Sequence, residues 1–338
     1  MSIARKFPAL LAAVCGLAFI CWRAAARRTF AGRVVIITGG SRGLGLALAR
    51  RLAREKTNLA LIARDEEELE RAKMVLSGYG SIVSTWPCDV RNEIQLRHTI
   101  HQIAERFGRI DVLINNAGEI VVGPFASTSR DDYERAMQLH FWAPFTAVFA
   151  ALPFLRERPA AWIINIASFG GRVAVPHLGP YCVSKFALAG LSDSLHAELA
   201  REHISVTTVT PGLMRTGSHK NALFKGDHRK EFMWFSLGAA NPLISMGADR
   251  AAKQILSAAR RKKASLTITF SARAAILANA LFPNLVAKVL SIVARLLPGM
   301  PVRGGEKTHS GWESESKLSP SILTSLADRA TEQFNEKW

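Results

Sequence analysis

Between residues 32 and 270, short runs of apolar and β-branched residues alternate with longer segments of helical character. Seven runs predict strands, at Val34–Thr38, Leu59–Ile62, Ile82–Trp86, Val112–Asn115, Trp162–Ala167, Ile204–Thr210 and Leu266–Phe270. Helices are predicted between them at Leu44–Arg54, Asp65–Leu76, Glu93–Phe107, Tyr133–Leu155, Tyr181–Arg201 and Ala248–Arg260, the fourth interrupted near Pro144. Strict alternation of this kind predicts a parallel sheet with helices on both faces, which is a doubly wound α/β domain.

The composition agrees with a single α/β domain that carries a tail at each end. Of the 338 residues, 49% are hydrophobic and 21% charged, so the chain can bury a sizeable core and is not a mostly disordered protein. Its four cysteines, Cys15, Cys21, Cys88 and Cys182, form no CxxC pair and have no His neighbours at zinc spacing. We therefore expect neither a disulfide scaffold nor a metal site, and the low cysteine content suits a reducing compartment.

The chain is strongly basic, because 44 Lys and Arg against 27 Asp and Glu give a formal net charge of +17. The basic residues are scattered, and no helix-turn-helix, zinc-finger or RNA-recognition pattern accompanies them, so nucleic acid is not an expected partner. Attraction to an anionic membrane surface explains the charge more simply, since the chain contains two candidate membrane segments.

The first candidate membrane segment lies within residues 1–28. Phe7–Trp22 is a run of 16 residues without a charge, flanked by basic residues that are denser on its C-terminal side. The run is shorter than a full span of about 20 residues, and we favour an uncleaved anchor over a cleaved signal peptide or a buried helix. The charge asymmetry would place the following domain, residues 29–270, on the cytoplasmic side of the membrane.

The second candidate lies within residues 271–300. On a helical wheel of Leu285–Leu297, Lys288, Ser291 and Arg295 form a narrow polar face, and apolar residues fill the rest. This pattern fits either a helix packed on the domain or a dimer partner, or an amphipathic helix in a membrane interface. Residues 301–338 form a polar tail that we expect to be largely disordered, apart from a short helix around residues 321–334.

A glycine-rich turn, Thr38-Gly39-Gly40-Ser41-Arg42-Gly43-Leu44-Gly45, follows the first predicted strand and opens the first helix. Glycines let a backbone approach a pyrophosphate, and a helix N-terminus presents free N–H groups and a positive potential. The strand–turn–helix context predicts a dinucleotide site rather than an ordinary turn. Its candidate binding residues are Thr38, Gly39, Ser41, Arg42, Gly43, Leu44 and Gly45.

The end of the second strand predicts which dinucleotide binds. An NAD enzyme carries an acid there for the ribose hydroxyl, whereas this chain has Ala63 followed by Arg64. Arg42 and Arg64 could hold the 2′-phosphate of NADP by paired hydrogen bonds. Asp65 is the competing signal for NAD, but it lies two residues late, so we expect NADP(H).

Tyr181 and Lys185 lie four residues apart on a predicted helix and share a face, and Ser168 ends the fifth strand 13 residues earlier. A phenol has a reference pKa of about 10. A neighbouring ammonium would lower that pKa toward the working pH. Tyr181 could then donate a proton to a carbonyl oxygen as the carbonyl receives hydride, while Ser168 hydrogen-bonds the same oxygen.

With these motifs in order, the chain from Gly32 to Phe270 resembles the short-chain dehydrogenase/reductase family. The further matching motifs are Cys88-Asp89-Val90, Asn115-Asn116-Ala117-Gly118, and Pro211-Gly212 with Thr216. The resemblance implies a Rossmann-type sheet of about seven strands and a nicotinamide cofactor. It assigns Asp89 to the adenine, Asn116 to the cofactor cleft, Lys185 to the nicotinamide ribose beside Tyr181, and Pro211, Gly212 and Thr216 to the carboxamide. Val90, Ala117 and Gly118 are further cofactor-binding candidates from the same motifs.

One position departs from the family pattern. The family usually places an Asn in the helix before the serine strand, where it helps to hold a proton-relay water, and this sequence has His140 there. A histidine can donate and accept hydrogen bonds, so His140 is a catalytic candidate, with a purely structural histidine as the alternative.

Evidence on the substrate comes from Met214–Gly247, where the family keeps a mobile lid. The segment contains Leu223, Phe224, Phe232, Met233, Trp234, Phe235 and Leu237. An apolar lid and a membrane anchor together favour a lipid, steroid, retinoid-like or acyl carbonyl, by analogy with the membrane-anchored hydroxysteroid and retinol dehydrogenases of the family. The resemblance also implies a homodimer or homotetramer.

We therefore expect a membrane-associated, NADP(H)-dependent oxidoreductase that interconverts a carbonyl and a primary or secondary alcohol. Two alternatives stay open: a catalytically weak NADP(H)-binding sensor, and a membrane scaffold protein with a vestigial nucleotide site. The presence of Ser168, Tyr181 and Lys185 favours the enzyme. Stoichiometric NADPH binding without turnover would favour the sensor, and no binding would favour the scaffold.

Overall fold

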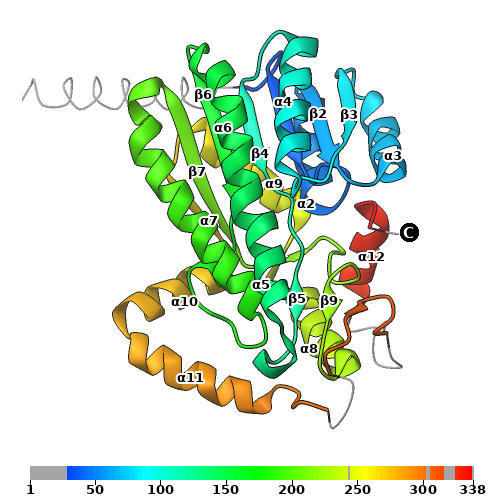
Figure 1. The fold of residues 1–338 in the computed structure, drawn as a ribbon, viewed down its shortest axis with the longest axis vertical. Helices are drawn as coiled ribbons and strands as arrows, with labels where there is room; N and C mark the ends of the chain where they lie inside the picture. Colours follow the sequence, from blue (N-terminus) through cyan, green and yellow to red (C-terminus); the bar gives the residue numbers. More distant parts are fainter. Residues whose placement is uncertain (1–28, 243, 302–304, 316–323, 337–338) are drawn as a thin grey trace, which may run out of the picture.

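The computed structural model describes residues 29–242, 244–301, 305–315 and 324–336, and the predicted membrane anchor in residues 1–28 lies outside them. A seven-stranded parallel sheet forms its centre, in the order β11-β7-β6-β4-β1-β2-β3 (Figure 1). The strands are β1 Val34–Thr38, β2 Asn58–Ala63, β3 Val83–Pro87, β4 Val112–Asn115, β6 Ala161–Ile166, β7 Ile204–Pro211 and β11 Ser265–Ile268. The doubly wound Rossmann-type fold and its seven strands are thus confirmed.

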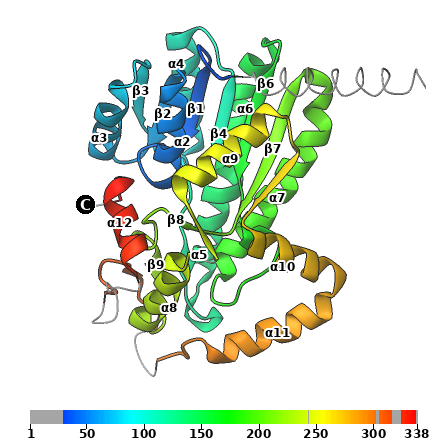
Figure 2. The same cartoon turned by 180° about the vertical axis from the view of Figure 1, so that it is seen from behind.

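Helices cover both faces of this sheet. On one face lie α2 (Gly43–Arg54), α3 (Glu66–Ser77) and α9 (Ala248–Arg260), and on the other α4 (Glu93–Phe107), α6 (Ala143–Arg156) and α7 (Gly179–Glu198) (Figures 1 and 2). Successive residues of a strand point to opposite faces, so in β1 Val35 and Ile37 join one core while Ile36 joins the other. The helices α4 and α9 have the bounds that the sequence predicts.

The sequence predicts an interruption near Pro144 in the long helix before β6. The structure has a π-helical turn just before this residue. α5 (Arg130–Met137) passes into α6 through this turn at Gln138–Trp142, and Pro144 then lies in the first turn of α6, where its missing N–H is tolerated. Among the described residues, Arg130–Arg156 is the one helical stretch long and apolar enough to cross a membrane, but half of its most apolar part is buried inside the domain. A core helix of a soluble protein has the same composition.

A smaller set of elements stands at the carboxyl ends of the strands. The lid, residues 213–247, contains β8 (Leu213–Arg215), β9 (Leu223–Phe224), α8 (His228–Ala240) and β10 (Ser245–Gly247). β9 pairs with β5 (Val121–Val122) and with β12 (His309–Ser310), and β8 pairs with β10. Short 3-10 helices lie at Phe125–Ser127, Phe169–Gly171 and Leu199–Glu202.

Two helices extend from the edge strand of the sheet. β11 ends at Ile268 rather than at Phe270, because Thr269 caps α10 (Phe270–Leu281) by accepting the N–H of Ala272. α11 (Pro283–Leu296) confirms the predicted amphipathic helix, and it packs chiefly against α10 (Figure 1). No residue of α11 is buried by the described part of the chain, so this helix is not packed on the domain as one alternative held.

The C-terminal residues form structure where the sequence predicts little. Residues 305–315 and 324–336, here called the C-terminal arm, contain β12 and α12 (Ser325–Gln333) and bury Ala327, Ala330 and Phe334. Phe334 and Ala330 join the core that also contains α2. The short helix expected around residues 321–334 is confirmed by α12, whereas the expectation of disorder is wrong for residues 305–315, where β12 pairs with β9 of the lid.

Candidate active site

The turn between β1 and α2 has a shape that requires glycine. Gly39 has φ +63°, a left-handed conformation that residues with a side chain rarely adopt. A Cβ at Gly45 would overlap the carbonyl oxygen of Gly39. The side-chain amide of Asn116, after β4, donates to the carbonyls of Thr38 and Gly39 at 3.1 and 2.9 Å. Asn116 therefore holds the shape of the turn.

The N-terminus of α2 opens directly from this turn. α2 begins at Gly43, no side chain caps it, and Arg42 precedes it. Thr216 of the lid lies 3.9 Å from the position that a Cβ on Gly43 would take. Backbone N–H groups at a helix start beside a guanidinium suit an anion such as a pyrophosphate. The turn thus fits a dinucleotide in both shape and charge.

Ser168, Tyr181 and Lys185 come together at the carboxyl end of β6. The Ser168 hydroxyl oxygen accepts the N–H of Gly170 at 3.1 Å, which orients the side chain. Tyr181 lies in the first turn of α7 and hydrogen-bonds Ser168. Lys185 is buried one turn later, donates to the Ile166 carbonyl at 2.8 Å, and has its Nζ 5.8 Å from the centre of the Tyr181 ring. This arrangement can hold and protonate a carbonyl oxygen.

The electrostatics of this set differ from the sequence-based expectation. Burial raises the pKa of Tyr181 to about 12, and the hydrogen bond with Ser168 opposes the rise. Burial also lowers the pKa of Lys185 to about 7, because a low-dielectric surrounding disfavours the charged form. The expected lowering of the phenol pKa is therefore wrong for this structure, and Tyr181 is a protonated donor at neutral pH.

Residues 33–225, which carry the glycine-rich turn, Ser168, Tyr181 and Lys185, match the family described as short chain dehydrogenase. The chain belongs to the short-chain dehydrogenase family. Members of this family are oxidoreductases that bind nicotinamide cofactors, act on small molecules and usually form oligomers.

Individual relatives match the core of this short-chain dehydrogenase. A dehydrogenase/reductase SDR family protein 7-like protein of Anopheles gambiae is 36% identical over 197 residues, which are 57% of this chain and 62% of that protein. A fatty acyl-CoA reductase of Acinetobacter baylyi is 35% identical over 192 residues, 56% of this chain and 65% of that protein. A solved short-chain dehydrogenase of Streptomyces avermitilis has 25% identity and a TM-score of 0.67, covering 78% of this chain and 98% of its own. The chain thus spans less than two thirds of the two curated relatives.

His140 stands where short-chain dehydrogenases usually carry Asn, and both of its ring nitrogens have partners. It lies in the π-helical turn, where Nε2 accepts the N–H of Glu119 at 3.2 Å and Nδ1 lies 2.7 Å from the Ser184 hydroxyl. Ser184 itself donates to a backbone carbonyl of α7, so the His140 proton belongs on Nδ1. Burial and the charge of Lys185 hold the His140 pKa well below its usual value. A neutral ring with two protein partners favours the structural alternative over a relay.

The two arginines predicted to select NADP lie in different surroundings. Arg42 pairs with the Glu68 carboxylate at 2.8 Å, and Glu68 also accepts the Ser41 hydroxyl at 2.9 Å. Arg64 is exposed at the end of β2. Its neighbour Asp65, the competing acid, caps α3 by accepting the N–H of Glu68 at 2.8 Å. Arg64 is therefore the more accessible partner for a phosphate.

The remaining predicted cofactor residues follow β3, β4 and β7 at the same edge of the sheet: Asp89, Val90, Ala117, Gly118, Pro211, Gly212 and Thr216. Asp89 is already engaged, since it forms an ion pair with Arg91 at 2.7 Å. Gly212 faces Thr269, whose hydroxyl would lie 2.7 Å from an added Cβ. A contact of these residues with a cofactor stays a prediction.

Several polar residues of the site escape prediction from the sequence. Glu68 and Glu336 are buried beside Arg42. No sequence pattern near Glu68 on α3 or near Glu336 in the C-terminal arm marks them as neighbours of Arg42, because only the fold brings these distant segments together. Asn165, by contrast, is a polar residue inside a predicted apolar strand, and it accepts a hydrogen bond from Asn115 at 2.8 Å. A buried polar residue in a strand is a signal for such a pair.

Proposed function

We propose that this short-chain dehydrogenase is an NADP(H)-dependent reductase that interconverts an apolar carbonyl compound and its alcohol at a membrane surface. The observation that carries the proposal is the grouping of Ser168, Tyr181 and Lys185 at the sheet edge that also carries the glycine-rich turn. A bound nicotinamide would supply the hydride, and the residues of the chain would orient and protonate the carbonyl oxygen.

Each residue of the set has a distinct task in this mechanism. Ser168 hydrogen-bonds the carbonyl oxygen of the substrate, and Tyr181 gives its phenolic proton to that oxygen as negative charge develops there. Lys185, in its ammonium form, stabilises the phenolate that is left. Because the Tyr181 pKa is about 12, the phenol is protonated at neutral pH and can act as the acid of the reduction. His140 contacts the substrate in no step and positions α7 through Ser184.

The surroundings of Tyr181 are apolar on one side, and the apolar substrate class rests on the lid and on the named relatives. Its ring packs against a cluster from α7, β5 and the lid: Val122, Leu178, Cys182, Ala222, Phe224, Phe232 and Phe235. This cluster is a buried core on one side of the phenol, whereas the cavity that reaches Tyr181 is lined mainly by polar residues, among them Arg91, Glu119, Asp132 and Arg135. The relative from Acinetobacter baylyi is named for a fatty acyl substrate, which agrees with this class.

The free face of α10 and α11 supports association with a membrane. Large apolar side chains are exposed along the two helices: Phe270, Leu277, Leu281, Phe282, Leu285, Val289, Ile292 and Leu296. The charged residues between 270 and 300 are Arg273, Lys288 and Arg295, all basic. An apolar face with basic edges suits an anionic lipid surface. In this proposal residues 1–28 are the anchor, residues 271–300 are a second attachment, and the domain of residues 29–270 faces the cytoplasm.

An aromatic row along the π-helical turn and α6 supports a homodimer or homotetramer. Phe141 and Trp142 of the π-helical turn and Phe145 and Phe149 of α6 form this row, with neighbouring ring centres 4.8 to 6.5 Å apart. Trp142 and Phe149 are about half exposed. Aromatic residues are enriched in the cores of protein interfaces, so a second copy of the chain is a suitable partner for this row.

Turnover of NADPH on a panel of apolar ketones and aldehydes tests the proposed reaction. We expect the full-length protein to oxidise NADPH in the presence of a substrate of this class, followed by the loss of nicotinamide absorbance. Stoichiometric NADPH binding without turnover on the whole panel would support the sensor instead. Absence of NADPH binding would support the scaffold.

A further inference from the structure

The end of the C-terminal arm lies on the glycine-rich turn. The carbonyl of Phe334 accepts the N–H of Gly43, the first residue of α2, at 2.9 Å. The side chain of Asn335 donates to the carbonyls of Ser41 and Glu68 at 3.0 and 3.1 Å. Asn335 has φ 58°, a left-handed conformation that Asn tolerates better than most residues. Residues 334 and 335 are therefore held to the turn by backbone and side-chain hydrogen bonds.

Glu336 brings a carboxylate to the place where the turn suits an anion. Its Oε1 lies 2.7 Å from the position of a Cβ on Gly43, and its Oε2 lies 3.5 Å from Arg42 Nε. Asn221 of the lid donates to the same Oε2 at 2.5 Å, and the side chain is 3% exposed. A carboxylate beside a helix start and a guanidinium imitates a phosphate group. A pyrophosphate cannot use the Gly43 N–H while the Phe334 carbonyl accepts it, and it must compete with Glu336 for Arg42.

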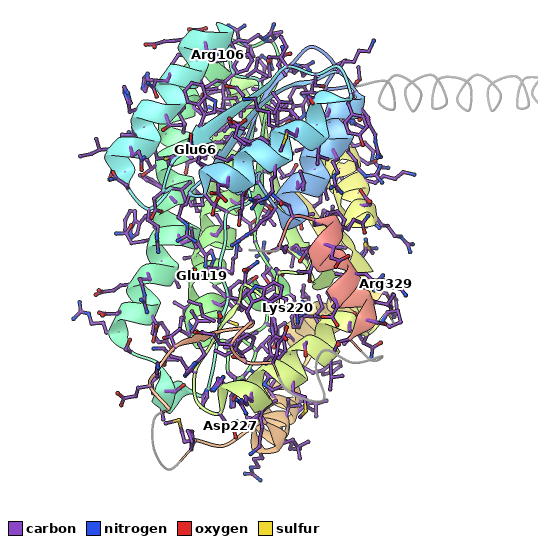
Figure 3. All side chains as sticks on the ribbon, turned by 90° about the vertical axis from the view of Figure 1, so that its right-hand side faces the viewer. Glu66, Arg106, Glu119, Lys220, Asp227 and Arg329 are labelled. Carbon is purple, nitrogen blue, oxygen red and sulfur yellow. The ribbon has the colours of Figure 1, made fainter. Side chains whose placement is uncertain are left out.

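The same arm also fastens the lid. β12 of the arm pairs with β9 of the lid. Lys220, which is almost fully buried, contacts Glu315 and lies 3.6 Å from Asp328 of the arm, and Asp328 is 3.4 Å from His219. Figure 3 shows α12, which carries Arg329, beside the segment that carries Lys220. One stretch of chain thus reaches from the glycine-rich turn to the lid that packs against Tyr181.

We propose that the C-terminal arm is an autoinhibitory segment that competes with the pyrophosphate of NADP(H) for the glycine-rich turn. This inference rests on the proposed function, because it takes the turn to be the dinucleotide site. In the docked state the arm occupies the Gly43 N–H and the Arg42 side chain and ties down the lid. In the released state the Gly43 N–H is open and Arg42 keeps only its pair with Glu68. The apparent affinity for the cofactor then equals the intrinsic affinity multiplied by the fraction of released molecules.

Substitutions at the end of the full-length chain test the competition. Asn335→Ala together with Glu336→Ala removes the contacts to Ser41, Glu68 and Arg42 and leaves the rest of the arm unchanged. Glu306→Ala is the matched control, since it removes an exposed acid of the same arm. We expect the double variant to bind NADPH at least about tenfold more tightly than the wild type in calorimetric titration, and the control to bind as the wild type does.

Hydrogen exchange of residues 324–336 in the wild type gives a second measurement that needs no variant. Addition of NADPH should speed exchange in this segment, because the cofactor displaces it. Slower exchange would make the arm a cover on bound cofactor and would overturn the proposal, as would equal or weaker NADPH binding by the double variant. Absence of NADPH binding to both the wild type and the double variant would refute the proposed function itself, and the competition with it.

Discussion

Nδ1 of His140 lies 2.7 Å from the hydroxyl oxygen of Ser184, and this contact ties the π-helical turn to the helix that carries Tyr181. Ser184 in turn lies 2.9 Å from the carbonyls of Pro180 and Tyr181 and donates to this first turn of α7. The ring of His140 also packs edge-on against the Tyr181 ring, with centres 5.4 Å apart. A residue that replaces the Asn of the family pattern therefore contacts the phenol-bearing helix at two points.

Replacing His140 should reduce stability and activity together. His140→Leu leaves the part-buried Glu119 N–H without its partner and removes the contact between the imidazole and Ser184, which still donates to backbone carbonyls of α7. We expect a loss of about 1–3 kcal/mol for the unpaired N–H in urea unfolding, and a lower kcat. His140→Asn can restore part of the hydrogen bonding. Its stability and kcat should therefore lie between those of the wild type and those of His140→Leu. The exposed His98→Leu on α4 is the control, and wild-type stability of His140→Leu would contradict the positioning role.

Removing the phenolic hydroxyl should stop the reaction and spare cofactor binding. Tyr181→Phe keeps the ring within its apolar cluster and removes the transferable proton. We expect kcat to fall by about 10²–10⁴-fold with an NADPH Kd near that of the wild type. Lys185→Ala should damage both, because Lys185 serves the phenol and, by family resemblance, the ribose. Tyr79→Phe on the opposite part of the domain is the control. Unchanged turnover in Tyr181→Phe would refute the mechanism.

The raised pKa of Tyr181 predicts different pH profiles for the two directions of reaction. Reduction uses the protonated phenol, which predominates below a pKa of about 12, so loss of the acid does not slow reduction between about pH 7 and 9. Loss of the Lys185 charge, with a pKa of about 7, should slow reduction over this range, because the ammonium stabilises the phenolate. Oxidation uses the phenolate, and its fraction grows about tenfold per pH unit below the pKa, so oxidation should speed up over the same range. Steady-state rates in both directions at matched ionic strength check this. An oxidation rate that peaks near neutral pH would be inconsistent with it.

Cofactor selectivity should depend more on Arg64 than on Arg42. We expect NADPH to bind about 10- to 100-fold more tightly than NADH, which is about 1.4–2.7 kcal/mol. Arg64→Ala should remove most of this difference, because Arg64 is exposed while Glu68 holds Arg42 at 2.8 Å. Arg106→Ala at the end of α4 is the control for charge alone. Titration of each variant with NADPH and with NADH gives the ratio of the two affinities. Equal affinities of the wild type for NADPH and NADH would refute the hypothesis that arginine selects NADP.

The apolar face of α11 should bind lipid without the N-terminal anchor. In protein that begins at residue 29, replacing Leu285, Ile292 and Leu296 by Ser removes exposed apolar surface and disturbs no core contact. We expect at least about tenfold weaker co-sedimentation with anionic vesicles, since each apolar side chain contributes about 1.5–3 kcal/mol on full burial. The control is a triple variant in which Met74, Val75 and Ile94, which are exposed on α3 and α4, are replaced by Ser. Equal vesicle binding by the two triple variants would argue against a membrane role of α11.

The strands, the helices and most of the site could be predicted because their signals are local. β1 and β4 have the predicted bounds, since a run of buried β-branched residues records a strand that is covered on both faces. Tyr181 and Lys185 could be paired from their spacing on one helix, and Ser168 could be placed because parallel strands bring their carboxyl ends to one edge. The amphipathic pattern of Leu285–Leu297 also predicted a helix, but it could not tell whether a domain, a partner or a membrane covers the apolar face.

By itself, then, the sequence determined the fold, the position of the glycine-rich turn and the grouping of Ser168, Tyr181 and Lys185 at one edge of the sheet. Only the tertiary structure decided which side chains from distant segments meet them. His140 meets Ser184, 44 residues away, and the glycine-rich turn at Ser41 meets Asn335, 294 residues away. Periodicity reports which face of an element is buried, whereas hydrogen bonds and ion pairs between elements depend on how those elements are arranged. The C-terminal arm is ordered for the same reason, because its few apolar side chains gain burial only against a surface that the folded domain provides.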